Sequence, residues 1–244
     1  MIYDTELAYL EDPYLTELET EIVAIGKDEQ GADLLFLEAT LFYPEGGGQP
    51  SDVGKIVGEH GTAQVLHARY AQGFVQHRCE IEGSLQVGEH VKCLLDWNER
   101  HRNMRAHTAG HVLHDALMQL PHPPNLFPVK GNHKKCYVEY SGDPLSPALA
   151  ADLESKCNQI IAANLEAHTR LVDLDELKRI CDFVPANLPA DKPLRVLWLD
   201  GYAPMPCGGT HVRFTGEIRP MKIIGINVKK ELNHLKYQIE EPAG

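Results

Sequence analysis

Two short motifs, far apart in the sequence, constrain most strongly what this chain can fold into. The first is HTAGH, in which His107 and His111 stand four residues apart, and the second is CGGTH, in which Cys207 and His211 have the same spacing. On a helix, four residues bring two side chains onto one face, and in a loop glycines let the backbone turn tightly enough for both side chains to reach one point. Thiolate and imidazole are the ligands that zinc prefers. We therefore expect a fold that brings all four side chains to one zinc ion.

The HTAGH pair alone is weak, because two helical histidines four apart are more often surface or core residues, and the CGGTH pair is the stronger signal. Four protein ligands are typical of a closed, structural zinc site, whereas a catalytic zinc keeps one position open for water. The spacing leaves both readings open. A metalloprotease of the H-E-x-x-H type is disfavoured, because its general-base glutamate would fall at Thr108.

The first ~95 residues are typical of β structure. Residues 21–25 and 34–39 are expected to be strands that flank a turn at 27–31, and short apolar runs separated by glycines follow them. Short strands with frequent glycine turns indicate a small barrel or sandwich. We expect a β-barrel-like N-terminal domain over residues 1–95 and a mixed domain over 96–244, and hence the α+β class.

The pattern changes at Asp96, which with Glu99 forms a plausible capping box for one long helix ended by Pro121. Residues 121–128 are expected to be loop. Ser146 and Pro147 open a second helix. Further elements are expected as strands at 135–140, 170–173 and 195–199, a short helix at 175–181, a loop at 203–210 and a hairpin of 221–228 with 235–240.

A third motif is the run EGGGQPSD, from Glu45 to Asp52. Three successive glycines expose backbone N–H groups, which suits close approach to a phosphate. The run lacks the Lys-Ser/Thr of a phosphate-binding P-loop. A tight turn at the edge of a barrel explains the glycines equally well, so the residues alone leave this motif open.

The net charge of −12 at first argues against a nucleic-acid partner. The acidic excess, however, belongs to residues 1–60, which hold 14 Asp and Glu but only Lys27 and Lys55, and the remaining 184 residues carry 21 charges of each sign. That part can still present basic patches, such as those around Arg100 and Lys130, although such patches are more often solvated faces.

Six widely scattered cysteines in a chain of this length do not indicate disulfides, and only Cys207 stands in a context that suggests chemistry. The first residues lack the basic and apolar regions of a secretory signal. No apolar run approaches the roughly 20 residues needed to cross a bilayer. We expect a soluble, cytoplasmic protein with no membrane partner.

Together, HTAGH, CGGTH and GGGQPSD resemble the editing domain of alanyl-tRNA synthetase, and more closely its free-standing relatives, the alanyl-tRNA editing proteins. Residues 40–55 are similar to the glycine-rich β-barrel of that family, and residues 96–225 to the editing domain that threonyl-tRNA synthetases also contain. Arg100, Met104 and the run from Thr215 to Ile218 fit the same pattern.

The resemblance implies that His107, His111, Cys207 and His211 bind zinc in an editing pocket. It implies ATP-independent hydrolysis of the ester that joins a wrong amino acid, chiefly serine and secondarily glycine, to alanine tRNA, which serves translation fidelity. Binding alone discriminates only about 10- to 200-fold per small group, so a second, hydrolytic site is needed. The expected pocket residues are Gln49, Thr108 and Thr210, and the expected tRNA-binding residues are Gly46, Gly47, Gly48, Arg100 and Lys130.

One position departs from the family pattern. The residue before the second zinc histidine is often Thr in the synthetase, where it could contact a serine hydroxyl, but here it is Gly110. Thr108, Thr210 or Gln49 are candidates to replace that contact. Zinc could activate the attacking water or position the substrate. We favour positioning, because four protein ligands leave little space for a zinc-bound hydroxide. No carboxylate stands out as the general base, and Glu45 and Asp52 are candidates only because of their motif. The alternatives are a non-catalytic tRNA-binding module with structural zinc, and a zinc hydrolase of small esters or peptides.

Overall fold

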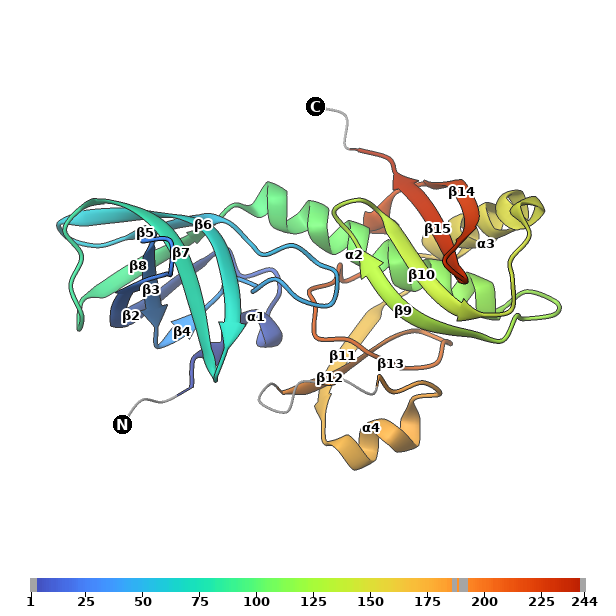
Figure 1. Cartoon of the computed structure of the whole chain (residues 1–244), viewed down its shortest axis with the longest axis horizontal. Helices are drawn as coiled ribbons and strands as arrows, with labels where there is room; N and C mark the ends of the chain where they lie inside the picture. The colour runs from blue at the N-terminus through green and yellow to red at the C-terminus, as the bar shows by residue number, and fades with distance from the viewer. Residues whose placement is uncertain (1–3, 186–187, 189–192, 242–244) are drawn as a thin grey trace. The chain divides into compact units, whose positions relative to one another are not determined.

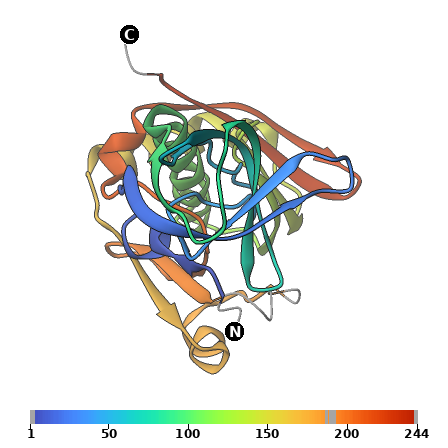
Figure 2. The same cartoon turned by 90° about the vertical axis from the view of Figure 1, so that its left-hand side faces the viewer.

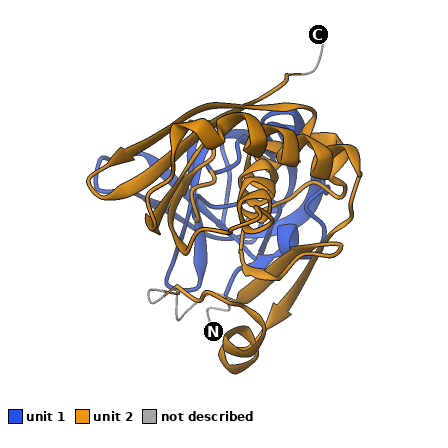
Figure 3. Ribbon diagram, turned by 90° about the vertical axis from the view of Figure 1, so that its right-hand side faces the viewer, with its two compact units in different colours: residues 1–46, 50–102, 190–192 blue, residues 47–49, 103–189, 193–244 orange. Residues whose placement is uncertain are grey.

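In the strands of the first part of the chain, buried residues alternate with more exposed ones. Ala63 and Val65, for example, are both buried on the inner face of one strand. The structure, a computed structural model, describes residues 4–185, 188 and 193–241. The chain divides into two units, shown in Figure 3: residues 1–46, 50–102 and 190–192 form the first, and 47–49, 103–189 and 193–244 the second. The division falls inside helix α2 (Trp97–Met118). The domain boundary expected at 95/96 stays a prediction.

The first unit is built on a closed β-barrel, which faces the viewer in Figure 2. Its strands pair in the order β2-β3-β7-β6-β5-β8. Their bounds are β2 Glu17–Lys27, β3 Asp33–Leu37, β5 Gly54–Val57, β6 Gly61–Ala71, β7 Phe74–Gly83 and β8 His90–Leu95. The unit also contains β1 (Glu6–Leu7), α1 (Ala8–Glu11) and β4 (Ala39–Thr40), and β1 pairs with β4. The expected α+β class with a small β-barrel is confirmed.

The barrel is filled by one apolar cluster, because every second residue of its strands points inward. Ile22, Leu35, Ile56 and Val75 are fully buried there. His77 lies among them: its Nδ1 donates to the carbonyl of Leu35 and its Nε2 lies 2.8 Å from the hydroxyl of Thr40. Burial lowers the pKa of His77 to about 4, so this ring is neutral.

The second unit contains two sheets, labelled in Figure 1. The larger has the order β14-β15-β10-β9, and the smaller has the order β11-β12-β13. The bounds are β9 Leu126–Asn132, β10 Tyr137–Gly142, β11 Ala167–Val172, β12 Leu194–Leu199, β13 Met205–Pro206, β14 Met221–Lys229 and β15 Leu232–Ile239. The expected C-terminal hairpin is thus confirmed as β14 and β15. Strand β14 is at one edge of the larger sheet, and β15 lies between β14 and β10.

Three α-helices of the described chain follow the barrel: α2, α3 (Ala150–Ala162) and α4 (Leu174–Ile180). Asp96 accepts a hydrogen bond from the backbone N–H of Glu99, which caps the start of α2 as expected. Ser146 caps a short 3-10 turn, η1 (Pro147–Leu149), rather than α3 itself, which begins at Ala150. A second 3-10 turn, η2 (Thr215–Ile218), follows the CGGTH motif.

Two short strands fall where only loop is expected from the sequence. Strand β9 begins at Leu126, inside the proline-rich stretch 121–128, and includes Pro128. A proline is tolerated because β9 is the edge strand of its sheet and Pro128 faces Tyr140 at an irregularity in the register. Strand β13 occupies two residues of the expected loop 203–210.

Among the described residues, no helix combines the length and the apolar character needed to cross a bilayer.

Candidate metal centre

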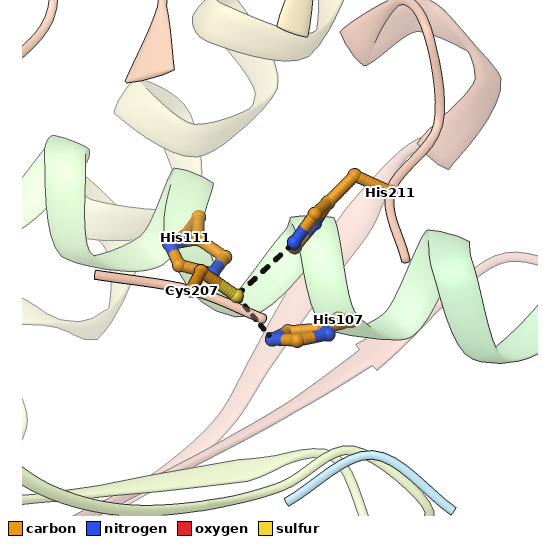
Figure 4. Close-up of side chains that lie close together, drawn as sticks. All are labelled: His107, His111, Cys207 and His211. Atoms are coloured by element: carbon orange, nitrogen blue, oxygen red, sulfur yellow. Dashed lines mark hydrogen bonds between the residues drawn. The ribbon is translucent and has the colours of Figure 1, made fainter. Parts of the chain in front are cut away.

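The four expected ligands meet in the second unit. One ligand atom from each of His107, His111, Cys207 and His211 lies within 4.8 Å of the others. The Cys207 Sγ is 3.4 Å from the Nε2 of His107 and 3.1 Å from the Nε2 of His211 (Figure 4). Helix α2 supplies the first two histidines, and the segment after β13 supplies the cysteine and the last histidine. The set is compact enough to hold a metal ion.

Gln49 fixes the orientation of His107. Its Oε1 accepts a hydrogen bond from the backbone N–H of Thr210 (3.0 Å), which identifies that atom as the oxygen. The same oxygen lies 2.8 Å from the Nδ1 of His107, so Nδ1 carries the proton and donates. The Nε2 of His107 is then the lone-pair atom, directed at the Cys207 sulfur, as a metal ligand requires.

Thr108 fixes the orientation of His211. Its hydroxyl donates to the carbonyl of Met104 (2.8 Å), so toward the Nδ1 of His211, 3.2 Å away, its oxygen accepts. The Thr108 oxygen also accepts from the backbone N–H of Val212. The Nε2 of His211 is therefore left with a lone pair for a metal. Of the three expected pocket residues, Gln49 and Thr108 thus contact ligand histidines, and Thr210 contacts Gln49. Whether any of them also contacts a substrate stays a prediction.

The histidine cluster is neutral without a metal. Burial lowers the pKa of His107 and of His211 well below its usual value, and lowers that of His111 to about 3. Only neutral imidazole offers the lone pair that a metal needs. Two rings held with Nε2 toward a thiol sulfur, and a third beside them, therefore fit a thiophilic metal ion.

Arg195, on β12, anchors the CGGTH loop, and sequence reasoning missed it. Its guanidinium donates to the carbonyls of Cys207 (3.3 Å) and Gly209, while its own carbonyl accepts from the N–H of Cys207 (2.9 Å). Its charge also contributes to the lowered pKa of His107 and His211. A lone arginine in a strand carries no motif by which the sequence could have shown this role.

Gly209 is required by close packing. A Cβ at this position would collide with the ring of His107 and would also lie 2.8 Å from the Oε1 of Gln49. The neighbouring Gly208 has no such contact. The two glycines of one motif therefore serve different purposes, and only the structure separates them.

The triple-glycine loop brings Gln49 to the centre. Gly46 accepts a hydrogen bond from the hydroxyl of Tyr43 (2.9 Å). Gly47 and Gly48 have positive φ angles of 56° and 84°, which glycine adopts without strain. A Cβ on Gly48 would collide with the backbone of Gly131 on β9. The loop is therefore shaped by close contacts of its own; its expected role in tRNA binding stays a prediction.

The two basic residues expected to bind tRNA lie in different settings. Lys130 is exposed on β9, next to Gly131. Arg100 is fully buried in the first unit, where its guanidinium donates to Asp52 and to the carbonyls of Pro13 and Leu41. Arg100 thus ties three segments of that unit together, and its expected contact with tRNA stays untested.

Glu45 and Asp52, the carboxylates of the glycine-rich motif, both have basic partners in the first unit. Glu45 is exposed and its Oε2 lies 2.7 Å from the Nε2 of His67. Asp52 is fully buried, accepts from the N–H of Tyr43 and forms the ion pair with Arg100. Whether either carboxylate acts as the general base stays a prediction.

A fourth histidine, His133, lies against the cluster and was not expected from the sequence. Its ring stacks on that of His107, with centroids 4.2 Å apart. Its Nδ1 is 3.0 Å from the hydroxyl of Tyr237, and that hydroxyl donates to the carbonyl of Ala106 (2.7 Å). It directly follows β9, in the turn that leads to β10, in a stretch with no recognisable motif.

A second group of metal-type side chains, Glu166, His168 and Asp200, lies outside this cluster. Glu166 and Asp200 are exposed, and His168 already pairs with Asp200 at 2.8 Å. Exposed acidic groups of this kind are common without a metal, so the buried cluster is the candidate site.

Comparisons with known proteins agree with this geometry. Residues 13–99 match the model of tRNA synthetases class II (A), and residues 200–234 match the threonyl and alanyl tRNA synthetase second additional domain. The chain is 31% identical to alanyl-tRNA editing protein AlaX-M of Methanosarcina barkeri over 96% of its own length and 98% of that protein. It is 32% identical to AlaX-M of Methanosarcina mazei, with 96% and 95% covered.

Longer relatives contain the same region. Alanine–tRNA ligase of Korarchaeum cryptofilum is 32% identical over 90% of this chain but only 24% of its own length. AlaX-L of Pyrococcus horikoshii is 30% identical, with 90% of this chain and 54% of that protein covered. With near-complete coverage of the AlaX-M relatives, the chain belongs to the family of alanyl-tRNA editing proteins.

Proposed function

We propose that this protein is a trans-acting aminoacyl-tRNA deacylase that removes wrongly attached serine, and more slowly glycine, from alanine tRNA, with zinc in the site of His107, His111, Cys207 and His211. Water attacks the ester carbonyl and the bond to the ribose oxygen breaks, which yields the free amino acid and the uncharged tRNA. Hydrolysis of an activated ester needs no ATP. Names of the relatives, which include alanyl-tRNA editing proteins, support this substrate class.

The single observation that carries the proposal is the orientation of the ligand histidines. Gln49 and Thr108 hold the Nδ1 protons of His107 and His211, so both Nε2 lone pairs face the sulfur of Cys207. One thiolate with three imidazoles is a donor set suited to zinc. A polarising divalent ion would supply charge stabilisation for the oxygens of the ester.

The chain's own residues supply position. Gln49 and Thr210 join the glycine-rich loop to the ligand loop through two hydrogen bonds, so both loops keep one arrangement when a substrate enters. The backbone at Gly47 has open space around it and supports the approach of a sugar–phosphate chain to this loop. Lys130 is exposed and adjacent to Gly131, which lies against Gly48 of the same loop. Its positive charge supports the binding of a phosphate near this loop.

The test is deacylation of alanine tRNA charged with Ser, Gly or Ala, by the purified protein and by the Cys207→Ala variant. We expect loss of serine with alanine spared in the wild type, and at least a 100-fold slower reaction in the variant, since the ligand set is broken. Circular dichroism of the variant checks that it is folded, and metal analysis checks its zinc content.

The competing function is a tRNA-binding module with structural zinc, favoured by the four protein ligands, which leave no obvious open position. It predicts that zinc-loaded protein binds alanine tRNA without turnover. Activity on small esters or peptides in the absence of tRNA would instead indicate a different zinc hydrolase. Either result overturns the proposed deacylase.

A further inference from the structure

The hydrogen-bond partners of the buried His133 determine which of its ring nitrogens carries the proton. The hydroxyl of Tyr237 gives its proton to the carbonyl of Ala106, so toward the Nδ1 of His133 its oxygen accepts. The proton of His133 therefore sits on Nδ1, and Nε2 carries the lone pair. Burial lowers the pKa of His133 to about 4, which keeps the ring neutral.

The Nε2 atom has no hydrogen-bond partner among the residues that the structure describes, although the side chain is only 6% exposed. A Cβ on Gly131 would lie 2.8 Å from Nε2. The absence of a side chain at Gly131 keeps this atom uncovered.

Gly110 lies beside the same ring. A Cβ at residue 110 would lie 2.7 Å from the Cε1 of His133 and 3.2 Å from its Nδ1. The imidazole thus occupies the space that a side chain on residue 110 would fill, one residue before the ligand His111. On its face the ring stacks against His107, with centroids 4.2 Å apart. His133 is therefore next to the metal ligands without belonging to their set.

The polar side chains that orient the ligand histidines are already committed. The hydroxyl oxygen of Thr108 takes part in three hydrogen bonds, and the Oε1 of Gln49 accepts two. The hydroxyl of Thr210 accepts a hydrogen bond from the Nε2 of Gln49.

We propose that His133 is the specificity-determining residue of the deacylase, whose Nε2 accepts a hydrogen bond from the side-chain hydroxyl of a seryl ester. This inference rests on the proposed function and adds to it the origin of its preference. Serine differs from alanine by this hydroxyl alone. A site that pairs with a substrate hydroxyl rejects the analogue that lacks it, because its own polar atom is then left unpaired.

The experiment compares kcat/KM for Ser- and Gly-charged alanine tRNA in the wild type and in His133→Phe, which keeps a ring beside Gly110 and His107. We expect a drop of about 10- to 100-fold for the seryl substrate and less than about 3-fold for the glycyl substrate, as one hydrogen bond is lost. His133→Gln, which can place an oxygen near the position of Nε2, restores part of the seryl rate. His122→Phe, an exposed histidine, is the matched control.

Gly110→Ala provides an independent variant, because its Cβ displaces the His133 ring. It reproduces the selective loss on the seryl substrate. An equal loss on both substrates, or lower zinc content in His133→Phe, shows a structural role and overturns the inference, as does an unchanged seryl rate. A wild type inactive on all charged tRNAs overturns the proposed function and this inference together, whereas an active wild type with unaltered variants overturns the inference alone.

Discussion

The side-chain amide of Gln49 forms two hydrogen bonds with Thr210, one from its Nε2 to the hydroxyl (2.8 Å) and one to its Oε1 from the backbone N–H (3.0 Å). The pair joins the GGGQ loop to the CGGTH loop, which lie 161 residues apart in the sequence. The oxygen that accepts from Thr210 also accepts from His107. One amide group therefore sets both the shape of the ligand loop and the tautomer of a ligand.

Replacing Gln49 by alanine should weaken metal binding without unfolding the protein. The Nδ1 of His107 loses its acceptor, and loss of such an outer-sphere partner typically costs about 10- to 100-fold in metal affinity. Competition with a chromophoric chelator measures the zinc affinity. Gln30→Ala, at an exposed position of the barrel unit, is the control. Equal affinities for wild type and Gln49→Ala would show that the orientation of His107 does not depend on this bond.

Thr108 offers a test in two steps. Thr108→Val removes the acceptor for His211 and for the N–H of Val212 in a fully buried place, and should lower the free energy of unfolding by about 1–3 kcal/mol. Thr108→Ser keeps the oxygen and should retain most of the stability and the metal. Urea denaturation of both variants, with zinc content measured in parallel, decides this. A serine variant as damaged as the valine variant would point to the lost methyl group instead.

Alanine substitutions at the two glycines of the ligand loop should affect zinc binding differently. Gly209→Ala places a Cβ against the ring of His107 and the side-chain amide of Gln49, and should abolish stoichiometric zinc binding. Gly208→Ala meets nothing within 4 Å and should bind zinc normally. Metal analysis after gel filtration gives the zinc content of each variant. Full zinc content in Gly209→Ala would mean that the loop relaxes without cost.

Asp115, on α2, should make stability depend on pH. Burial raises its pKa to about 8 from the usual 3.8. Between these values the folded state holds a proton that the unfolded state has released, so stability is highest below the unfolded pKa and falls as the pH rises toward 8. Asp115→Asn removes this slope. From pH 5 to pH 7.5 the wild type should lose on the order of 2–3 kcal/mol relative to the variant, as measured by urea denaturation; parallel curves would place the carboxyl pKa near its ordinary value.

Much of this architecture is predictable because it is local. The helix with the two histidines follows from its cap at Asp96 and its stop near Pro121, and it is found over Trp97–Met118. The metal ligands can be predicted from the spacing of His and Cys in HTAGH and CGGTH, because a metal site needs only a few residues at fixed intervals. The barrel follows from alternating burial and frequent glycines, which the closed sheet confirms.

What could not be predicted depends on contacts between distant segments. Arg195 and His133 stand in no motif, and their roles arise only because β12 and the turn after β9 fold against the ligands. Arg100 was expected in a tRNA-binding patch, and the sequence did not indicate that it lies fully buried beside Asp52. Charge in a sequence does not say whether a side chain faces water or an internal partner.

The order of strands in the larger sheet has a consequence for how the protein is made. Strand β15 lies between β10 and β14, although it is synthesised after both. Strands β9, β10 and β14 therefore leave the ribosome without the partner that joins them. Tyr237, which fixes His133, belongs to the same late strand. The larger sheet, and with it the contact between Tyr237 and His133, is thus completed only when translation has passed residue 239, after all four metal ligands have been synthesised.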